Sequence, residues 1–133
     1  MRRAPRIAVV VPAYQEAATI AGVVRRAVAQ ADAVIVVDDG SHDGTGDAVA
    51  GLDVTVLRHE RNLGKGASLA HGIARALDMG AEAVITLDAD GQHEPEEIPR
   101  LVRAWEAGRG DVIIGARLRH AERAPRLRKG ANR

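Results

Sequence analysis

The sequence predicts an α/β fold in which helices cover both faces of a mostly parallel central sheet, giving three layers. Short apolar runs alternate along the chain with longer segments in which apolar residues recur at helical spacing, a pattern typical of consecutive strand–helix–strand units. The short runs are apolar throughout, which indicates strands that are buried on both faces. With 133 residues, the chain has the length of one domain.

The first strand–helix–strand unit is expected near the N-terminus. A β-branched run at residues 7–11 predicts a strand, and Pro12 is expected to close it. Apolar residues recur at helical spacing over residues 20–31 and predict a helix. A second apolar run at residues 34–37 predicts the next strand, which residues 38–40 close with two acids and a glycine.

The remaining elements follow the same alternation. Strands are expected at residues 54–57, 84–87 and 112–114, with a helix at residues 65–79 between the first two. Pro95 marks the start of a further helix, because proline fits the first helical turn, where its missing N–H is not needed. Since ligands of open α/β sheets bind beyond the carboxyl ends of the strands, a site is expected in the segments that follow these strands.

The composition excludes several functions. Apolar residues make up 46% of the chain, but it has no Phe, one Trp and one Tyr, so the core is aliphatic and stacking on nucleic-acid bases is hardly available. We therefore expect no nucleic-acid partner. Cys is absent, which excludes disulfides and thiolate ligands, and no apolar run approaches the roughly 20 residues of a membrane span. A cytoplasmic location is expected.

Basic residues are concentrated at the C-terminal end. Although the net charge of the whole chain is +1, residues 115–133 contain seven Arg or Lys residues and one Glu. Such a charge run is either a solvated chain end or a surface for phosphates or anionic lipid headgroups. We expect a domain at residues 1–118 and a basic tail at residues 119–133. In the second interpretation, the tail makes peripheral contact with the inner face of an anionic membrane.

An acidic triplet, Asp88-Ala89-Asp90, follows the apolar run at residues 84–87. Two carboxylates separated by one residue can offer oxygen ligands to Mg²⁺ or Mn²⁺, whose other positions are filled by water and phosphate oxygens, and Gln92 could supply a further oxygen. A metal between these groups and a diphosphate would neutralise the charge that develops on a leaving nucleoside diphosphate. The alternative is a solvated turn, because Asp and Gly are common in turns.

A second acidic pair, Asp38 and Asp39, follows the run at residues 34–37. Carboxylates at a strand end can accept hydrogen bonds from ribose hydroxyls or base N–H groups, which favours a binding role for this pair. Asp43, further along, is expected to cap a short helix that begins near Gly44.

Lys65 lies between two glycines at the start of the helix expected at residues 65–79. A phosphate at this position could meet both the ammonium group and the free N–H groups of the helix. The spacing is not that of a P-loop, and a glycine-rich helix entry without a ligand is the alternative.

Together these segments resemble the family 2 glycosyltransferases, inverting enzymes whose Rossmann-like GT-A fold binds a nucleotide sugar. The resemblance covers essentially the whole chain and is closest to the polyprenyl-phosphate sugar synthases, the group of the dolichyl-phosphate mannose synthases. Each motif is weak alone, but five of them occur in the order and spacing of the family. They are VPAYQE at residues 11–16, VVDDGSHDGT at 36–45, NLGKG at 62–66, LDADGQH at 87–93 and IIGAR at 113–117.

The resemblance implies a reaction and a set of site residues. An acceptor oxygen, expected on a polyprenyl phosphate, would attack the anomeric carbon while the nucleoside diphosphate departs on the metal. Asp90 and Arg117 are the expected catalytic residues, with Arg117 near a donor or acceptor phosphate. Metal ligands would be Asp88, Asp90 and Gln92. The nucleotide sugar would lie against Pro12, Tyr14, Glu16, Val37, Asp39, Lys65, Asp88, Ala89 and Asp90.

Two departures from the family pattern limit what the resemblance implies. Ala116 stands where the family usually has Ser or Thr, and family catalytic domains usually continue beyond the position of Arg133. We therefore expect a C-terminally truncated chain: a fragment, a truncated gene product or a donor-binding module without turnover. The function is either that of a glycosyltransferase or that of a truncated, non-catalytic nucleotide-sugar-binding domain of the same fold.

Two other protein classes fit the acidic motifs less well. Aspartyl-phosphate phosphatases carry a similar Asp-x-Asp motif near the N-terminus and need a later acidic pair, which the segment after Asp90 lacks. A receiver domain carries its acidic pair after the first strand, whereas Asp38 and Asp39 follow the second.

Overall fold

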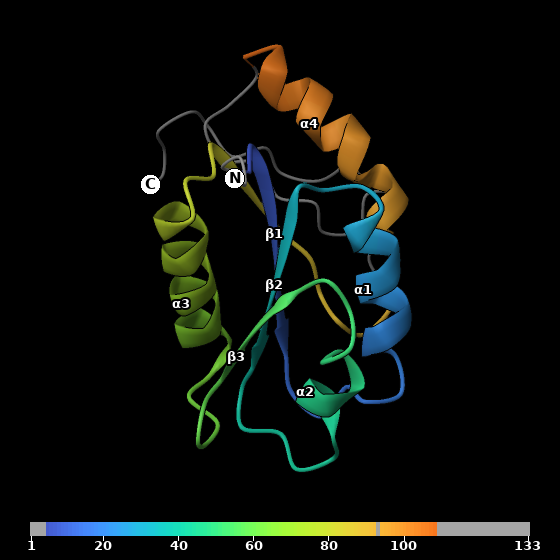
Figure 1. Cartoon of the computed structure of the whole chain (residues 1–133), viewed down its shortest axis with the longest axis vertical. Helices are drawn as coiled ribbons and strands as arrows, with labels where there is room; N and C mark the ends of the chain where they lie inside the picture. Colours follow the sequence, from blue (N-terminus) through green and yellow to red (C-terminus); the bar gives the residue numbers. More distant parts are fainter. Residues whose placement is uncertain (1–4, 93, 109–133) are drawn as a thin grey trace.

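The computed structural model describes residues 5–92 and 94–108, and Figure 1 shows how the elements are arranged. The strand predicted at residues 112–114 lies outside the described residues. In chain order the elements are β1 (Ile7–Ala13), α1 (Ile20–Val28), β2 (Ala33–Asp38), α2 (Thr45–Ala48), β3 (Thr55–Arg58), α3 (Lys65–Asp78), β4 (Ala83–Thr86), a 3₁₀ turn η1 (Pro95–Glu97) and α4 (Ile98–Glu106).

The four strands form one parallel sheet in the order β3-β2-β1-β4, which confirms the predicted parallel arrangement. In this sheet Val9 pairs with Val34 on one side and with Ile85 on the other. The chain proceeds outward from β1 through β2 to β3 and then crosses back to place β4 on the other side of β1. The loops that follow β1 and β4 therefore diverge, and such a switch point is where open α/β sheets bind ligands.

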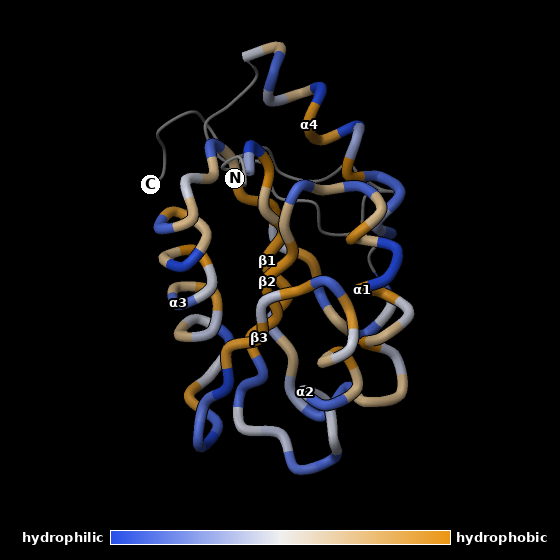
Figure 2. Tube along the Cα trace, viewed as in Figure 1, coloured by the Kyte–Doolittle hydropathy of each residue, from blue (hydrophilic) through white to orange (hydrophobic). Residues whose placement is uncertain are grey.

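Helices cover both faces of the sheet, so the predicted three layers are confirmed. Figure 1 shows α3 on one face and α1, α2 and α4 on the other. Because side chains of a strand alternate between the faces, Val10 and Val37 pack in the cluster under α3 while Val9 and Val11 pack in the cluster under α1. Figure 2 shows these strands as the apolar centre of the molecule, with hydrophilic loops at the end where α2 lies.

The expectation that Pro12 closes the first strand is wrong, because β1 continues through Pro12 to Ala13. Val10 accepts a hydrogen bond from Leu87 on the β4 side, whereas Ala13 accepts one from Asp39 on the β2 side. Successive residues of a strand turn their backbone groups to opposite sides, so Pro12, like Val10, is turned toward β4. It lies beyond the last residue pair of the β1–β4 ladder, where no N–H is needed. Proline is tolerated there because no ladder hydrogen bond is lost.

Three helices differ in detail from the prediction. Helix α1 ends at Val28 rather than at residue 31, and Pro95 opens a 3₁₀ turn that leads into α4 instead of the α-helix itself. Helix α2 has Gly44 at its N-cap, but the Asp43 carboxylate accepts a 3.0 Å hydrogen bond from the first helical N–H, as its predicted capping role requires. Among the described residues, no helix is long and apolar enough to cross a membrane.

Gly72 brings α3 close to the sheet. A Cβ atom at this position would lie 2.3 Å from Cγ1 of Val10, which is fully buried and has little room to move. Gly22 on α1 has no atom within 4 Å of the corresponding position. Both Gly→Ala changes gain the same helix propensity, but only the one at Gly72 overpacks the core. We therefore expect the free energy of unfolding of Gly72→Ala to be lower than that of Gly22→Ala by roughly 1–3 kcal/mol. Urea unfolding of both variants measures this difference, and equal stabilities would contradict the close packing.

Candidate functional site

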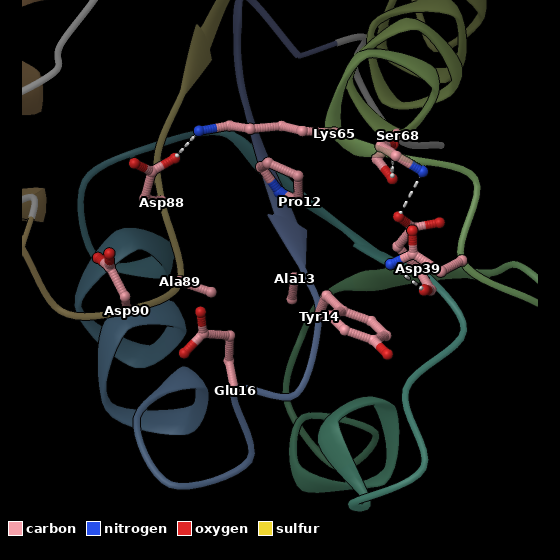
Figure 3. A pocket seen from close by; sticks show the side chains of 12 residues that line it. Pro12, Ala13, Tyr14, Glu16, Asp39, Lys65, Ser68, Asp88, Ala89 and Asp90 are labelled. Atoms are coloured by element: carbon pink, nitrogen blue, oxygen red, sulfur yellow. Dashed lines mark hydrogen bonds and ion pairs between the residues drawn. The ribbon is translucent and has the colours of Figure 1, made fainter.

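A cavity of about 260 Å³ opens beyond the carboxyl ends of the strands, at the switch point between β1 and β4 (Figure 3). The segments after β1, β2 and β4 and the start of α3 form its walls. It contains eight of the nine residues predicted to contact a nucleotide sugar, whereas Val37 is buried under α3 and does not line it. The lining residues are Pro12, Ala13, Tyr14, Glu16, Asp39, Asn62, Gly64, Lys65, Ser68, Asp88, Ala89 and Asp90.

One side of the cavity is acidic, with Glu16, Asp88 and Asp90 on neighbouring loops (Figure 3). Burial raises the pKa of the Glu16 carboxyl, and the negative charge of Asp90 raises it further. A hydrogen bond with Thr19 opposes these effects, while the charges of Asp43 and Asp88 add smaller increases. Burial is the main cause of the raised pKa, and the repulsion from Asp90 shows that several carboxylates face one another here, an arrangement that favours a bound cation.

The donor set fits a hard divalent cation that is shared with a ligand. Carboxylate oxygens are the protein ligands that Mg²⁺ and Mn²⁺ prefer, and Asp88 and Asp90 present them at the cavity wall. Within residues 5–92 and 94–108, however, no group of three or more acidic or His side chains could hold a metal by itself. Water and phosphate oxygens would have to complete the coordination shell, as is usual for Mg²⁺ bound with a nucleotide.

Gln92, the third predicted metal ligand, does not line the cavity. Its backbone N–H donates a 2.9 Å hydrogen bond to Oδ1 of Asp90. This bond holds the turn at the end of the triplet and restricts the orientation of the Asp90 carboxylate.

Lys65 spans the cavity from the start of α3 to the end of β4 (Figure 3). Its Nζ atom lies 2.8 Å from Oδ1 of Asp88 and forms an ion pair with it. The Lys65 side chain is 62% exposed, and ion pairs at such positions contribute about 0–1 kcal/mol. A phosphate or a metal could therefore separate this pair at little energetic cost.

Asp39 lies on the opposite side of the cavity and is 3% exposed. Its Oδ1 accepts a 2.8 Å hydrogen bond from the N–H of Leu63, its Oδ2 accepts a 2.9 Å bond from the N–H of Gly64, and Nδ1 of His59 lies 2.7 Å from Oδ1. Burial alone would raise the pKa of the Asp39 carboxyl. The hydrogen bonds from His59, Leu63 and Gly64 outweigh burial and hold this pKa below its ordinary value, so Asp39 is ionised at neutral pH.

Asp38, which was expected to share the binding role of Asp39, instead shapes the loop after β2. It is buried outside the cavity lining, and its carboxylate accepts 3.1 Å hydrogen bonds from the N–H groups of Ser41 and Gly46. Gly40 follows at a φ of +78°, where a Cβ would lie 2.4 Å from the backbone carbon of Arg61. A glycine is required here because the loops after β2 and β3 touch through their backbones.

The loop after β1 is tied to the loop after β2. Gln15 has a φ of +56°, which is uncommon for a residue with a side chain. Its backbone N–H donates to Ser41 Oγ at 2.9 Å, and its side-chain oxygen accepts from the N–H of His42 at 2.7 Å. These bonds hold a turn from which Tyr14 and Glu16 both reach the cavity. Backbone strain of this kind is found where a binding site requires a particular geometry.

Comparison with known proteins identifies the family. The sequence profile of glycosyl transferase family 2 matches residues 8–132. The chain belongs to this family. An undecaprenyl-phosphate mannosyltransferase of Micrococcus luteus is 37% identical over 120 residues, which cover 84% of this chain and 48% of that protein. The chain spans about half the length of the curated relatives it matches.

Solved structures of family 2 glycosyltransferases confirm the predicted GT-A fold. A mannosyltransferase from Pyrobaculum calidifontis, in complex with GDP-Man and Mn²⁺, aligns with a TM-score of 0.51 and 33% identity, over 65% of this chain and 28% of that one. Glucosyl-3-phosphoglycerate synthase from Mycobacterium tuberculosis, solved with Mn²⁺, UDP and glucosyl-3-phosphoglycerate, aligns with a TM-score of 0.59 and 26% identity, over 76% of this chain and 39% of that one. Both of these structures contain Mn²⁺.

Several residues that line or support this cavity had no predicted role. Asn62 lines the cavity, and its side-chain amide donates to the backbone oxygen of Asp39 at 3.4 Å. Ser68 is fully buried one helical turn after Gly64 and donates to its carbonyl at 3.1 Å. Ser68 could have been found from the sequence, because it is a small polar residue on the side of the predicted helix that faces the sheet. Arg117, the second predicted catalytic residue, lies outside the described residues.

Proposed function

We propose that the cavity binds a nucleotide-diphosphate sugar together with Mg²⁺ or Mn²⁺, and that the chain provides the donor site of an inverting glycosyltransferase. The observation that carries this proposal is that Asp39 and the pair Asp88 and Asp90 line opposite sides of one cavity (Figure 3). A buried, ionised carboxylate at one end suits the N–H or hydroxyl groups of a nucleoside, and an acidic pair that is more accessible to solvent, at the other end, suits a metal-bound diphosphate.

In this proposal the nucleoside lies between Tyr14 and Asp39, and the diphosphate extends toward Asp88 and Asp90. Helix α3 begins at Lys65, so its positive end and the Lys65 ammonium would both attract the phosphates once that ammonium leaves Asp88. The metal, when bound, neutralises negative charge that develops on the departing nucleoside diphosphate. Gln92 and Arg117 keep their proposed roles as a further metal ligand and as a phosphate contact.

For the acceptor we propose a polyprenyl phosphate. An oxygen of this phosphate would form the new bond to the anomeric carbon as the bond from that carbon to the nucleoside diphosphate breaks, which inverts the configuration. Support comes from two relatives. One is the undecaprenyl-phosphate mannosyltransferase described above, and the other is a polyprenol monophosphomannose synthase of Mycolicibacterium smegmatis that is 39% identical over 126 residues, which cover 88% of this chain and 47% of that protein.

Calorimetry with GDP and UDP sugars, each with and without Mn²⁺, tests the donor site directly. We expect binding that requires the metal. Release of nucleoside diphosphate is then measured with polyprenyl phosphate present. Release that depends on the acceptor supports the full reaction, and metal-dependent binding without release supports a donor-binding domain that does not turn over by itself. If no nucleotide diphosphate binds, the proposed function is wrong.

The basic segment at residues 119–133 is proposed to contact an anionic membrane surface. Each basic residue near such a surface contributes about 1 kcal/mol, so replacing Arg126, Arg128 and Lys129 with Gln should weaken binding to phosphatidylserine vesicles by about 100-fold. Cosedimentation measures this binding, which should fall as salt is added because the attraction is screened. Equal partition to neutral and anionic vesicles would exclude an electrostatic surface.

A further inference from the structure

A chain of three side chains leads from the surface of α3 to the nucleoside end of the cavity. Nδ1 of His59 lies 2.7 Å from Oδ1 of Asp39, and Nε2 of the same ring lies 2.8 Å from Nδ1 of His71. The two imidazole rings meet edge to face, with centroids 4.9 Å apart and planes at 87°. The side chains of His59 and Asp39 are 9% and 5% exposed, whereas His71 is an exposed residue.

The hydrogen-bond chemistry assigns the tautomers. An ionised carboxylate accepts hydrogen bonds and donates none, so His59 must carry a proton on Nδ1 to bond with Asp39. In the neutral ring Nε2 is then an acceptor, and Nδ1 of His71 must carry the proton between the two rings. His71 thus holds His59 in the tautomer that donates to Asp39.

The carboxylate of Asp39 has little freedom left once these bonds are made. It has roughly four lone-pair positions. On Oδ1 the N–H of Leu63 and Nδ1 of His59 occupy both, and on Oδ2 the N–H of Gly64 occupies one. The one lone-pair position that remains is on Oδ2 of Asp39, and Asp39 lines the cavity. Without His59, a second position would open on Oδ1 and the carboxylate could turn.

We propose that His59 is a positioning residue of the donor site, which aims the free acceptor position of Asp39 at the nucleoside, with His71 fixing the tautomer of His59. This role rests on the proposed function, because it requires that Asp39 bind a nucleoside. His59 itself does not line the cavity and acts through Asp39.

Charged side chains on the neighbouring elements have other recorded partners. On the element before His59, Arg58 is paired with Asp47, and at the start of α3 Lys65 is paired with Asp88. From the loop after β2 the nearby acid is Asp38, whose oxygens accept backbone N–H groups. Asp39 and His71 are therefore the titratable partners that the structure records for the His59 side chain.

The direction of the pH dependence follows from the contributions at Asp39. Burial raises the pKa of this carboxyl, and the hydrogen bond from His59 is the largest effect that lowers it. Removing His59 should therefore raise the pKa of Asp39, so that its charge, and with it nucleotide affinity, is lost at a higher pH than in the wild type.

Asparagine at position 59 serves as a conservative variant, because its side chain keeps an N–H donor near the place of Nδ1 without the ring.

The experiment compares UDP and GDP affinities of the wild type, His59→Ala, His59→Asn and the control His42→Ala by calorimetry with Mn²⁺ from pH 7.5 to pH 5. His42 is exposed and its side chain does not line the cavity, so its loss should change nothing. We expect affinity to fall roughly tenfold in His59→Ala at pH 7.5, with a larger loss toward pH 5, and to recover to within about threefold of the wild type in His59→Asn. Dividing the affinity of each variant by that of the wild type at the same pH cancels the effect of phosphate titration in the nucleotide.

The outcomes separate the two proposals. If the wild type binds no nucleotide, the proposed function fails, and the role of His59 in donor binding fails with it. If the wild type binds but His59→Ala binds equally well at every pH, the role of His59 alone is overturned. A loss in His59→Ala that is independent of pH and is not restored by His59→Asn would indicate a general packing role and would also overturn it. Circular dichroism of each variant confirms that folded protein is compared.

Discussion

Replacing Asp90 with alanine is expected to weaken metal-dependent binding of a nucleotide sugar by roughly 100-fold or more while leaving the fold intact. Loss of residues that merely orient metal ligands typically weakens metal binding 10–100-fold, so loss of a ligand itself should reach at least the upper end of that range. Asp90 is exposed, and its hydrogen bond to the N–H of Gln92 is local to the turn. Calorimetry with and without Mn²⁺ measures the change.

Asp90→Ala should also leave the stability of the folded state unchanged or raise it. Glu16 has a pKa above its ordinary value, first because of burial and second because of the charge of Asp90. A carboxyl whose pKa is raised by folding favours the folded state below its unfolded pKa and loses that contribution as the pH rises through the folded pKa. Removing Asp90 reduces this repulsion, so at neutral pH the variant should unfold at the same urea concentration as the wild type or at a higher one.

A matched control is available in Asp53, an exposed residue between α2 and β3 that does not line the cavity. Asp53→Ala removes the same charge and should leave metal-dependent binding unchanged. If Asp90→Ala binds the nucleotide sugar with Mn²⁺ as tightly as Asp53→Ala does, the metal role of Asp90 is wrong. If it loses binding and stability together, Asp90 is a structural residue instead.

The fold could be predicted from the sequence because it depends on apolar periodicity. The β-branched runs that form β1 and β2 are too short for helices and apolar on both faces, and the segment that forms α3 repeats its apolar residues at helical spacing. The end of β1 could not be predicted in this way. Whether Pro12 ends the strand depends on which neighbour its missing N–H faces, and that is a property of the strand order.

Site residues that directly follow a strand could be predicted from the sequence. Site contacts between separate segments of the chain could not. Asp39, Asp88 and Asp90 reach one cavity because parallel strands end at the same edge of the sheet. By contrast, His59 and His71 are separated along the chain by most of the loop before α3 and its first two turns. Nothing in their spacing shows that they meet, because their contact depends on how α3 lies against the end of β3.

The largest effect on stability is expected at Asp39. Asp39→Ala removes the acceptor for the N–H groups of Leu63 and Gly64 and for Nδ1 of His59, and leaves these donors without that partner around a carboxylate that is itself almost fully buried. Leaving a buried donor without its acceptor typically costs about 1–3 kcal/mol, and three donors are affected, so we expect a loss of roughly 3–5 kcal/mol. Asp39→Asn has nearly the same shape but carries one acceptor oxygen and no charge, so it should recover part of this loss.

The pH dependence separates the charge of Asp39 from its shape. Because the folded state lowers the pKa of this carboxyl, its contribution to stability is present above the unfolded pKa of about 3.9 and is lost as the pH falls through the folded value. The difference in unfolding free energy between the wild type and Asp39→Asn should therefore be greatest near pH 7 and shrink below about pH 4. Urea unfolding at both pH values measures it. A difference that stays constant would mean that the loop after β3 is held by the shape of the Asp39 side chain, and that the nucleoside end of the cavity does not depend on an ionised carboxylate.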